Sequence, residues 1–273
     1  MKGFLTRLRL SFKKHYYNFF RKNNIVMFHF GRCGSTITAQ YLSKNHDLYW
    51  ADEIYEQCNL LKNGDVLDPS DPFNVLERHQ YRARTKYFGL EIKIFKGQHL
   101  DQNLINLSIQ ELIKELKLRK FNKFILLQRS NFLQQYYSAH YGDQTKSWFI
   151  SSSNLKTTNR RKKIILPVNP ASMGSFKVPL KEYFDEMNRV YDEVLEQLKE
   201  ESLLILNYEK DVLQNSKVGY KKIMDFIGYR DYGLNLKEDF VKGNFYPMKE
   251  LIANFEDVEH QLRDTSYEWM LST

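Results

Sequence analysis

The short stretch GRCGST, residues 31–36, carries residue types that suit the binding of an anion. Its two glycines permit backbone conformations that bring N–H groups close to a ligand, and its serine and threonine add hydroxyl donors. Arg32 adds a permanent positive charge. The apolar run Ile25–Phe30 precedes the stretch, and a helix-like pattern follows it. A helix N-terminus directly after a strand is a favourable site for a tetrahedral anion.

This stretch differs from two other kinds of anion-binding loop. A loop that binds nucleoside triphosphates places a lysine before its Ser or Thr, and no lysine precedes Ser35. A kinase also needs an aspartate at a strand end to hold Mg²⁺, whereas the buried run KFILL at 123–127 leads toward Arg129. Cys33 invites comparison with a phosphatase loop, but position 39, where that chemistry needs an arginine, is alanine. The stretch therefore favours an anion held without a metal, with Cys33 as a small loop residue.

A second candidate anchor follows the run KFILL. Arg129 comes just after this predicted strand, and Asn131 is a suitable N-cap for a following helix. Ser138 lies nine residues after Arg129 on that helix. A strand-end arginine and a helix serine can together bind a phosphate group. The alternative is an arginine paired with a surface acid and a serine that is merely part of a helix.

The two stretches together resemble the sulfotransferase superfamily that uses 3′-phosphoadenylyl sulfate (PAPS). In that family the first loop holds the 5′-phosphosulfate, and the strand-end arginine and helix serine hold the 3′-phosphate. The resemblance assigns the first role to Arg32, Cys33, Gly34, Ser35 and Thr36, and the second role to Arg129 and Ser138. The arginine in the loop and the nine-residue spacing resemble the bacterial carbohydrate-type branch. The implied fold is α/β, a three-layer P-loop-like fold with a central parallel sheet flanked by helices.

The resemblance extends over nearly the whole chain from about residue 24, and it implies roles in catalysis. The stretch HDLYWADEIYE places Glu53 at the family's catalytic glutamate, which implies that Glu53 is the general base for the acceptor hydroxyl. The stretch YFGLEIK places Lys93 near the transfer site, where it would assist. Arg32 would neutralise charge on the sulfuryl group and the leaving phosphate, and no metal is implied. His29, His46 and His99 are competing bases, although His29 lies within a predicted strand and is better explained as a packed side chain.

Apolar runs alternate with amphipathic helical stretches, which predicts βαβ units and a parallel sheet. The predicted strands are residues 25–30, 87–95, 123–127 and 203–206, and the predicted helices are residues 36–44, 109–118, 131–141, 180–200, 218–227 and 251–262. Residues 146–177 are polar and basic and are predicted to form a long loop. We expect a single sulfotransferase-like domain over residues 23–273, preceded by a basic amphipathic appendage, residues 1–22. Tyr208 and Glu209 follow the last predicted strand, and Glu209 is interpreted as structural.

Composition narrows the class of protein but does not choose among anionic partners. The chain has 273 residues, 42% hydrophobic and 27% charged, as expected of a globular protein with a sizeable core. Its formal net charge of +8 favours nucleotides, nucleic acids, acidic glycans or membrane surfaces as partners. Two cysteines, Cys33 and Cys58, provide neither a disulfide framework nor a zinc site, which fits a reducing compartment. No apolar run is long enough to span a membrane.

Several interpretations stay open at this point. Residues 1–22 either pack on the domain or dock on a membrane surface, so we expect a cytoplasmic protein with or without peripheral membrane contact. The basic cluster Arg160–Lys163 either steers an anionic acceptor or is a solvated loop. The first hypothesis is a PAPS-dependent sulfotransferase acting on a hydroxyl of a carbohydrate or glycolipid. The alternatives are a P-loop nucleotide kinase-like enzyme and a polyanion-binding or nucleic-acid-binding module without a recognised motif.

Overall fold

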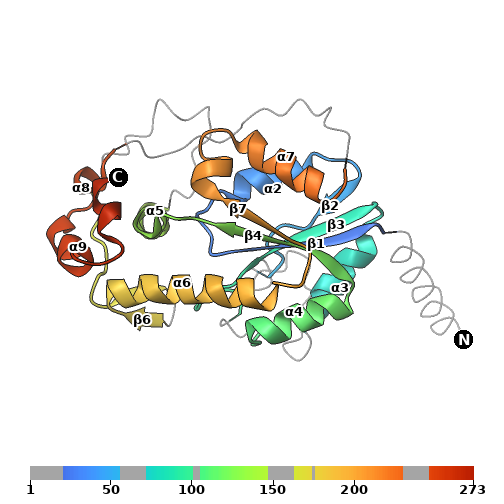
Figure 1. The fold of residues 1–273 in the computed structure, drawn as a ribbon, viewed down its shortest axis with the longest axis horizontal. Helices are drawn as coiled ribbons and strands as arrows, with labels where there is room; N and C mark the ends of the chain where they lie inside the picture. The colour runs from blue at the N-terminus through green and yellow to red at the C-terminus, as the bar shows by residue number, and fades with distance from the viewer. Residues whose placement is uncertain (1–20, 56–71, 101–104, 147–162, 174–175, 230–245) are drawn as a thin grey trace, which may run out of the picture.

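A five-stranded sheet forms the centre of the protein in the computed structural model (Figure 1). The structure describes residues 21–55, 72–100, 105–146, 163–173, 176–229 and 246–273. Every neighbouring pair of strands in this sheet is parallel. The spatial order is β2 (Leu48–Trp50), β3 (Tyr87–Lys93), β1 (Asn23–His29), β4 (Phe121–Gln128) and β7 (Leu203–Asn207). Because the strands are parallel, their carboxyl ends all meet at one edge of the sheet.

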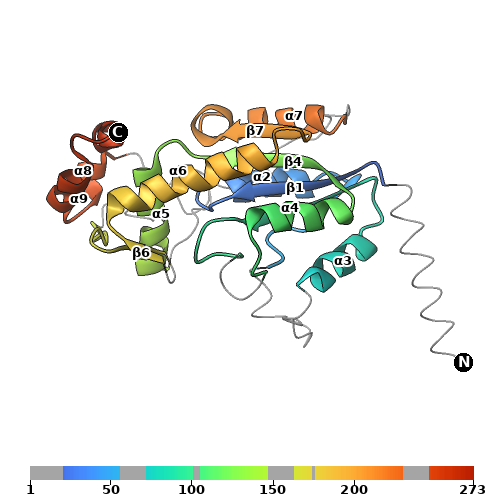
Figure 2. The same ribbon diagram turned by 60° about the horizontal axis from the view of Figure 1, so that its bottom comes forward.

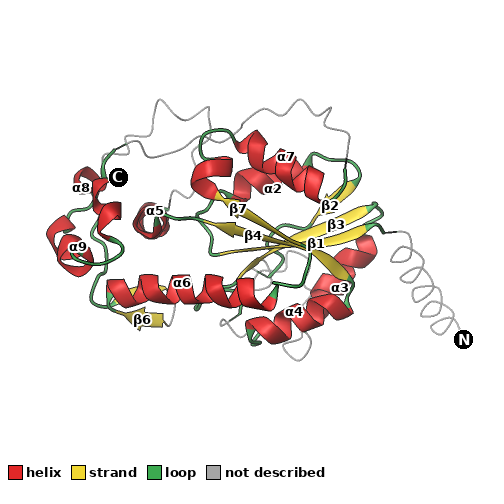
Figure 3. Ribbon diagram, viewed as in Figure 1, coloured by secondary structure: helices red, strands yellow, loops and turns green. Residues whose placement is uncertain are grey.

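Helices cover both faces of the sheet and complete three layers (Figures 1 and 2). One face carries α2 (Ser35–Ser43) and α7 (Ser216–Phe226), which pack on each other. The other face carries α3 (Phe73–Arg82), α4 (Ile109–Leu118) and α6 (Leu180–Gln197). The predicted three-layer α/β fold with a central parallel sheet is therefore confirmed. Figure 3 shows how the strands form the middle layer.

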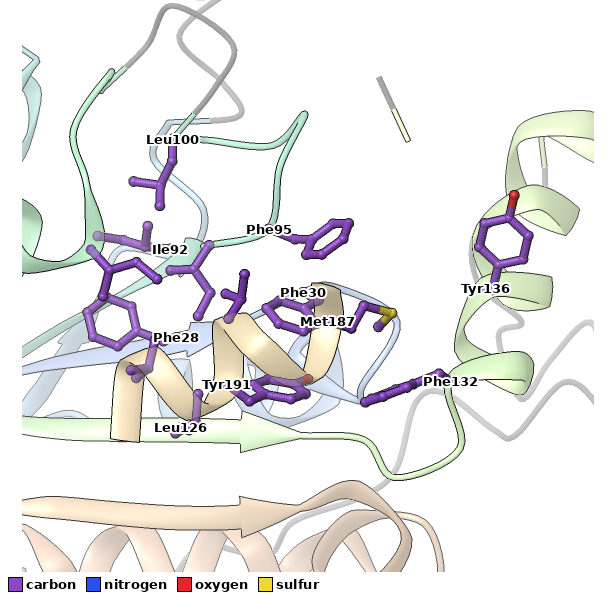
Figure 4. Close-up of a cluster of buried hydrophobic side chains, with 14 of the residues drawn as sticks. Phe28, Phe30, Ile92, Phe95, Leu100, Leu126, Phe132, Tyr136, Met187 and Tyr191 are labelled. Carbon is purple, nitrogen blue, oxygen red and sulfur yellow. The ribbon is translucent and has the colours of Figure 1, made fainter. Parts of the chain in front are cut away.

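Two buried apolar layers follow from the alternation of side chains along the strands. On β1, Ile25 and Met27 face the layer beneath α2 and α7. Val26 and Phe28 face the layer beneath α4 and α6. All four side chains are completely buried, so β1 is apolar on both faces, as a central parallel strand must be. Figure 4 shows part of the second layer, which continues beyond the end of β1 at Phe30.

The remaining elements lie beyond the carboxyl edge of the sheet. They are α5 (Phe132–Thr145), the hairpin of β5 (Ala171–Met173) and β6 (Phe176–Val178), the π-helix η3 (Tyr208–Val212), α8 (Met248–Leu251), α9 (Phe255–Leu262) and the 3₁₀ helix η4 (Glu268–Ser272). Asn131 caps α5 by accepting the Gln134 N–H at 2.8 Å, as its type and place predicted. This capping fixes where α5 starts relative to the end of β4.

Three parts of the sequence prediction differ from the structure. The helix expected over residues 251–262 is divided into α8 and α9, because Ile252 is extended and bridges to Ile164. The loop expected over residues 146–177 contains strand β5 and the start of β6. The short strand β2 and helix α3 were not expected. The strands and the break at Ile252 have short local patterns, and long-range pairing decides their conformation. Helix α3 has ten residues with one buried side, so its signal is local.

Some predictions fall on residues outside the described ranges, namely the amphipathic helix within residues 1–20, Cys58 and most of the basic cluster Arg160–Lys163. Arg21 is described, and its guanidinium donates to the carbonyls of Gln80 and Ala83 at the end of α3. In the described part of the chain, none of the helices combines the length and the apolar character needed to cross a bilayer.

A carboxylate on α6 joins this helix to the segment after β3. Glu186 receives a bidentate pair from Arg189 at 2.7 and 2.8 Å and lies 2.8 Å from the Lys96 ammonium. The Arg189 hydrogen bonds, aided by Lys96 and opposed by partial burial, lower the pKa of Glu186 to about 2.

We expect Glu186→Gln to lower the melting temperature at pH 7 because the variant loses this charge-assisted network. A lowered pKa stabilises the folded state above the unfolded value of about 4.5, so the stability difference should shrink as the pH falls from about 4.5 toward 2. Thermal melts from pH 7 to pH 3 measure the difference. Glu196→Gln, which removes an exposed pair with Lys199, is the control and should change little. A difference that is independent of pH would contradict the assignment.

Candidate active site

The segments that follow the parallel strands lie at one edge of the sheet, and they carry most of the residues singled out from the sequence. The loop of residues 30–34 follows β1, and the turn with Glu53 follows β2. Lys93 is the last residue of β3 and pairs in register with His29, the last residue of β1. Arg129 follows β4 directly. This edge is where ligands bind in open parallel sheets.

The first loop has a backbone that only a few residue types adopt easily. Gly31, Arg32 and Gly34 all have positive φ angles, of 80°, 53° and 84°. A Cβ atom at Gly34 would lie 2.7 Å from a Val212 methyl carbon and 3.0 Å from the Tyr208 ring, so this position also requires close approach. Gly34 is therefore needed both for its conformation and for its contact with η3.

Helix α2 begins directly after this loop with its N-terminus open. Gly34 is the N-cap, no side chain caps the helix, and the Thr38 N–H donates to the Gly34 carbonyl. The helix dipole and the N–H groups of the first turn make this end favourable for an anion. Thr36 is exposed there, whereas Ser35 is buried. Cys33 is completely buried, so its thiol cannot reach a ligand from the conformation seen here, and its contribution at this end is its backbone.

The second predicted anchor lies against the first. The Arg32 Nε donates to the Ser138 hydroxyl at 3.0 Å, although these residues are 106 positions apart. The Gln135 amide on the same helix donates to the Gly31 carbonyl at 2.6 Å. The tertiary structure therefore brings the loop after β1 and helix α5 into contact, and the binding of an anion by them stays a prediction.

Arg129 supports the first loop through buried contacts. Its side chain is 7% exposed, and it donates to the Arg32 carbonyl at 2.8 Å and to the Gln134 side chain at 2.9 Å. Its guanidinium also lies over the Tyr208 ring, 4.5 Å from the centroid. Burial lowers the pKa of Arg129, while nearby Tyr208 and Glu209 oppose the shift. Arg129 therefore holds the first loop in shape.

Glu209 completes the support of Arg129. Its two carboxylate oxygens accept the backbone N–H groups of Ser130 and Asn131, at 2.9 and 3.2 Å, and one of them lies 3.6 Å from the Arg129 Nε. The carboxylate thus neutralises the buried guanidinium and fixes the start of α5. This geometry agrees with the structural interpretation of Glu209. Its position directly after a strand was the signal in the sequence.

Glu53 and Lys93, the predicted base and its assistant, form an ion pair. The Lys93 Nζ lies 2.6 Å from a Glu53 carboxylate oxygen, and both side chains are about one-fifth exposed. The Lys93 Cε lies 3.5 Å from the place of a Cβ at Gly31, so the lysine extends over the first loop. Glu53 is therefore within reach of solvent and lies beside the loop.

Two of the three candidate histidines, His29 and His99, lie near this pair. Glu91, a buried carboxylate beside His29, was not among the residues singled out from the sequence. His29 is completely buried, and its Nε2 lies 3.0 Å from Glu91, a buried carboxylate, and 3.8 Å from Glu53. His99 is also buried, and its Nδ1 accepts the Lys93 backbone N–H at 3.0 Å. His46 is exposed and pairs loosely with Asp47. Glu91 carried a weak signal, as an acidic residue inside a β-rich run.

Burial and charge act in opposite directions on His29. Burial disfavours the imidazolium form, whereas nearby Cys33 and Glu91 favour it. The Gly31 N–H donates to the other ring nitrogen, Nδ1, at 2.9 Å. Only an unprotonated Nδ1 can accept this bond, so protonation of the ring would disturb the first loop.

His29, Glu53 and Glu91 together form a candidate donor set for a metal ion. One ligand atom from each lies within 4.8 Å of the others, and the described residues hold no second group of this kind. However, the Lys93 ammonium contacts Glu53 and the His29 ring contacts Glu91, so both carboxylates already have cationic or N–H partners. These residues therefore do not fit a divalent cation. The first loop, with Arg32 and an open helix end, has the donors that suit an anion.

A small pocket opens beside Arg32, between the first loop and helices α5 and α6. Aromatic and apolar side chains line much of it, including Phe30, Phe95, Tyr136 and Met187. Figure 4 shows Phe30, Phe95 and Met187 close together beyond the end of β1. In this structure the pocket has room for little more than a water molecule, so it is an apolar crevice beside Arg32.

Comparison with known proteins adds little beyond the fold. No protein-family model and no curated protein matches the chain. Among solved structures, the chain is similar to a sulfotransferase from Alicyclobacillus acidocaldarius, with 11% sequence identity and a TM-score of 0.43. The match covers 80% of this chain and 87% of the other.

We expect Arg129→Lys to lower the free energy of unfolding by about 2 kcal/mol, because lysine keeps the charge but cannot donate at once to Arg32 and Gln134. Urea unfolding followed by fluorescence measures the change. Arg78→Lys, on the exposed surface of α3, is the matched control and should stay within about 0.5 kcal/mol of the wild type. If both substitutions changed the free energy of unfolding equally, the buried Arg129 guanidinium would not be needed for stability.

Proposed function

We propose that this protein is a sulfotransferase that moves the sulfuryl group of PAPS to a hydroxyl acceptor. The observation that supports it best is the contact between Arg32 and Ser138, which joins two stretches that resemble the two phosphate-binding motifs of that family. The Glu53–Lys93 pair lies beside the same loop, where an acceptor would have to react. Three separate parts of the resemblance thus meet at one edge of the sheet.

The proposed chemistry depends on positioning and charge rather than on a covalent intermediate. The bond between sulfur and the bridging phosphate oxygen breaks, the bond between sulfur and the acceptor oxygen forms, and 3′,5′-adenosine diphosphate leaves. Glu53 takes the proton of the acceptor hydroxyl. Arg32, Lys93 and the first turn of α2 stabilise the charge on the transferring group and the leaving phosphate.

The proposed donor contacts follow the family assignments with one qualification from the geometry. The loop of Arg32, Cys33 and Gly34, with Ser35 and Thr36 at the start of α2, would hold the 5′-phosphosulfate. Ser138 and Arg129 would hold the 3′-phosphate. Because Gln134 now accepts from Arg129, we propose that its side chain rotates away when the 3′-phosphate binds.

We further propose an acceptor hydroxyl on a carbohydrate or glycolipid. Support comes from the resemblance of the first loop and of the Arg129–Ser138 spacing to the carbohydrate-type branch. A cytoplasmic protein with peripheral membrane contact through residues 1–22 is the setting we propose. A kinase-like enzyme is less favoured, because β3 ends in Lys93 and β4 leads into Arg129 instead of a Mg²⁺-binding aspartate.

Calorimetric titration with 3′,5′-adenosine diphosphate in the absence of Mg²⁺ tests the donor assignment. We expect binding that needs the 3′-phosphate, that weakens about tenfold or more in Ser138→Ala or Arg32→Ala, and that is unchanged in the control Ser43→Ala. ATP and 5′-AMP are the comparison ligands. No binding, or ATP binding that requires Mg²⁺, would refute the sulfotransferase proposal.

Glu53→Gln tests the proposed base. Its affinity for 3′,5′-adenosine diphosphate should stay within about twofold of the wild type, whereas PAPS turnover with sugar and glycolipid acceptors should fall by roughly two to four orders of magnitude. Turnover is measured as release of 3′,5′-adenosine diphosphate. Asp52→Asn removes the neighbouring carboxylate and should keep most of the activity. If the Asp52 variant loses as much activity as the Glu53 variant, the loss reflects the local charge and Glu53 is not the base.

A further inference from the structure

A row of buried polar side chains crosses three strands beneath the site. Trp50 ends β2, Glu91 lies in β3 and His29 ends β1. Glu91 is 2% exposed and His29 is completely buried. The same face of the sheet is otherwise lined by apolar side chains such as Ile25 and Met27. A carboxylate in such a layer is costly unless it is paired, so its retention calls for a role.

The backbone of β3 is shaped to let Trp50 reach Glu91. A Cβ atom at Gly89 would lie 2.2 Å from the Trp50 ring, so the ring can lie across β3 only because residue 89 has no side chain. From there the Trp50 Nε1 donates to one Glu91 oxygen at 2.9 Å. The other Glu91 oxygen lies 3.0 Å from the His29 Nε2. The carboxylate is thus held between an indole and an imidazole.

The imidazole of His29 touches both working parts of the site. Its Nδ1 accepts the N–H of Gly31 at 2.9 Å, which makes it a direct support of the first loop. Its Nε2, on the opposite side of the ring, lies toward Glu91 and 3.8 Å from the Glu53 carboxylate. The second Glu53 oxygen is bound by Lys93. The rigid His29 ring therefore lies between Gly31 of the first loop and Glu53, the proposed base.

Glu91 also interacts with Asp52, in the turn that follows β2. Burial and, second, the nearby Glu91 raise the pKa of Asp52, the neighbour of Glu53, to about 6. The Asp52 carbonyl also accepts the Glu91 backbone N–H at 3.0 Å. The turn that carries Glu53 is therefore connected to Glu91 both electrostatically and through the backbone.

We infer that the row Trp50–Glu91–His29 is a positioning device that fixes Glu53 and the first loop relative to each other. The inference rests on the proposed function for the role of Glu53 as base. None of the three side chains needs to touch a substrate. Glu91 keeps the His29 ring oriented, and His29 transmits that orientation to Gly31 on one side and to Glu53 on the other.

A test by pH must allow for every charged or titratable group around Glu53. These groups are His29 and Cys33 from β1 and its loop, Asp52 beside Glu53, and Glu91, Lys93 and His99 from β3 and the segment after it. Removing Glu91 takes away a like charge close to Glu53, so it should favour the ionised form of Glu53.

The experiment is a titration of the Glu53 carboxyl carbon by NMR in the full-length protein, assigned with Glu53→Gln. We expect Glu91→Gln to lower the midpoint of Glu53 by about one pH unit. We expect His29→Gln to move the Gly31 amide resonance and to weaken 3′,5′-adenosine diphosphate binding about threefold to tenfold, because the Gly31 bond is lost. His46→Gln, an exposed histidine, is the control and should change neither signal.

Trp50→Phe provides a milder change if Glu91→Gln does not fold. It keeps an aromatic ring and removes only the N–H to Glu91, and it should displace the Glu53 midpoint by a measurable, smaller amount. Midpoints and Gly31 resonances that match the His46 control in all folded variants would overturn the inference. Failure of the proposed function appears separately, as wild-type protein that does not bind 3′,5′-adenosine diphosphate, while the NMR signals still decide whether the row positions Glu53.

Discussion

The buried guanidinium of Arg129 is the contact on which the candidate site depends. It donates to the first loop at Arg32, is neutralised by Glu209 after β7, and lies over Tyr208. Three loops from three different strands are thereby tied to one planar cation. A buried charge of this kind is stable only when its partners are all present, so the loops hold their shapes together or not at all. The open N-terminus of α2 and the left-handed residues of the first loop can be maintained because this support lies beneath them.

A second buried charge, the Glu91 carboxylate, supports the part of the site that contains Glu53. Glu91 lies between Trp50 and His29 in an otherwise apolar layer, and its neighbours lead to Glu53 and to Gly31. The two supports contact neighbouring residues of the first loop, Arg129 from β4 at Arg32 and His29 from β1 at Gly31. Between them the anion-binding backbone and the proposed base are fixed on strand ends rather than on long loops. Such placement gives the precision that in-line group transfer requires.

Much of the fold was predictable because its signals are local. The apolar run before the first loop, the capping asparagine of α5 and the amphipathic stripe of α4 each specify an element within a few residues. The short strand β2 was missed, since three residues carry no reliable period. The division between α8 and α9 was missed because it depends on pairing of Ile252 with Ile164, nearly ninety positions earlier in the chain. Long-range pairing of this kind leaves no local trace.

The sequence alone determined which residues could bind an anion: glycines, an arginine and hydroxyls placed between a buried strand and a helix, with Arg129 and Ser138 at a fixed step further on. These follow from residue type and spacing, which local physics controls. Only the tertiary structure decided what each residue faces. It placed the Arg129 guanidinium beneath the loop instead of at the surface, buried the Cys33 side chain, and joined Glu53 to Lys93 and His29 to Glu91. Those outcomes depend on which strands lie side by side, and the order of strands in a sheet is set by the packing of the whole chain.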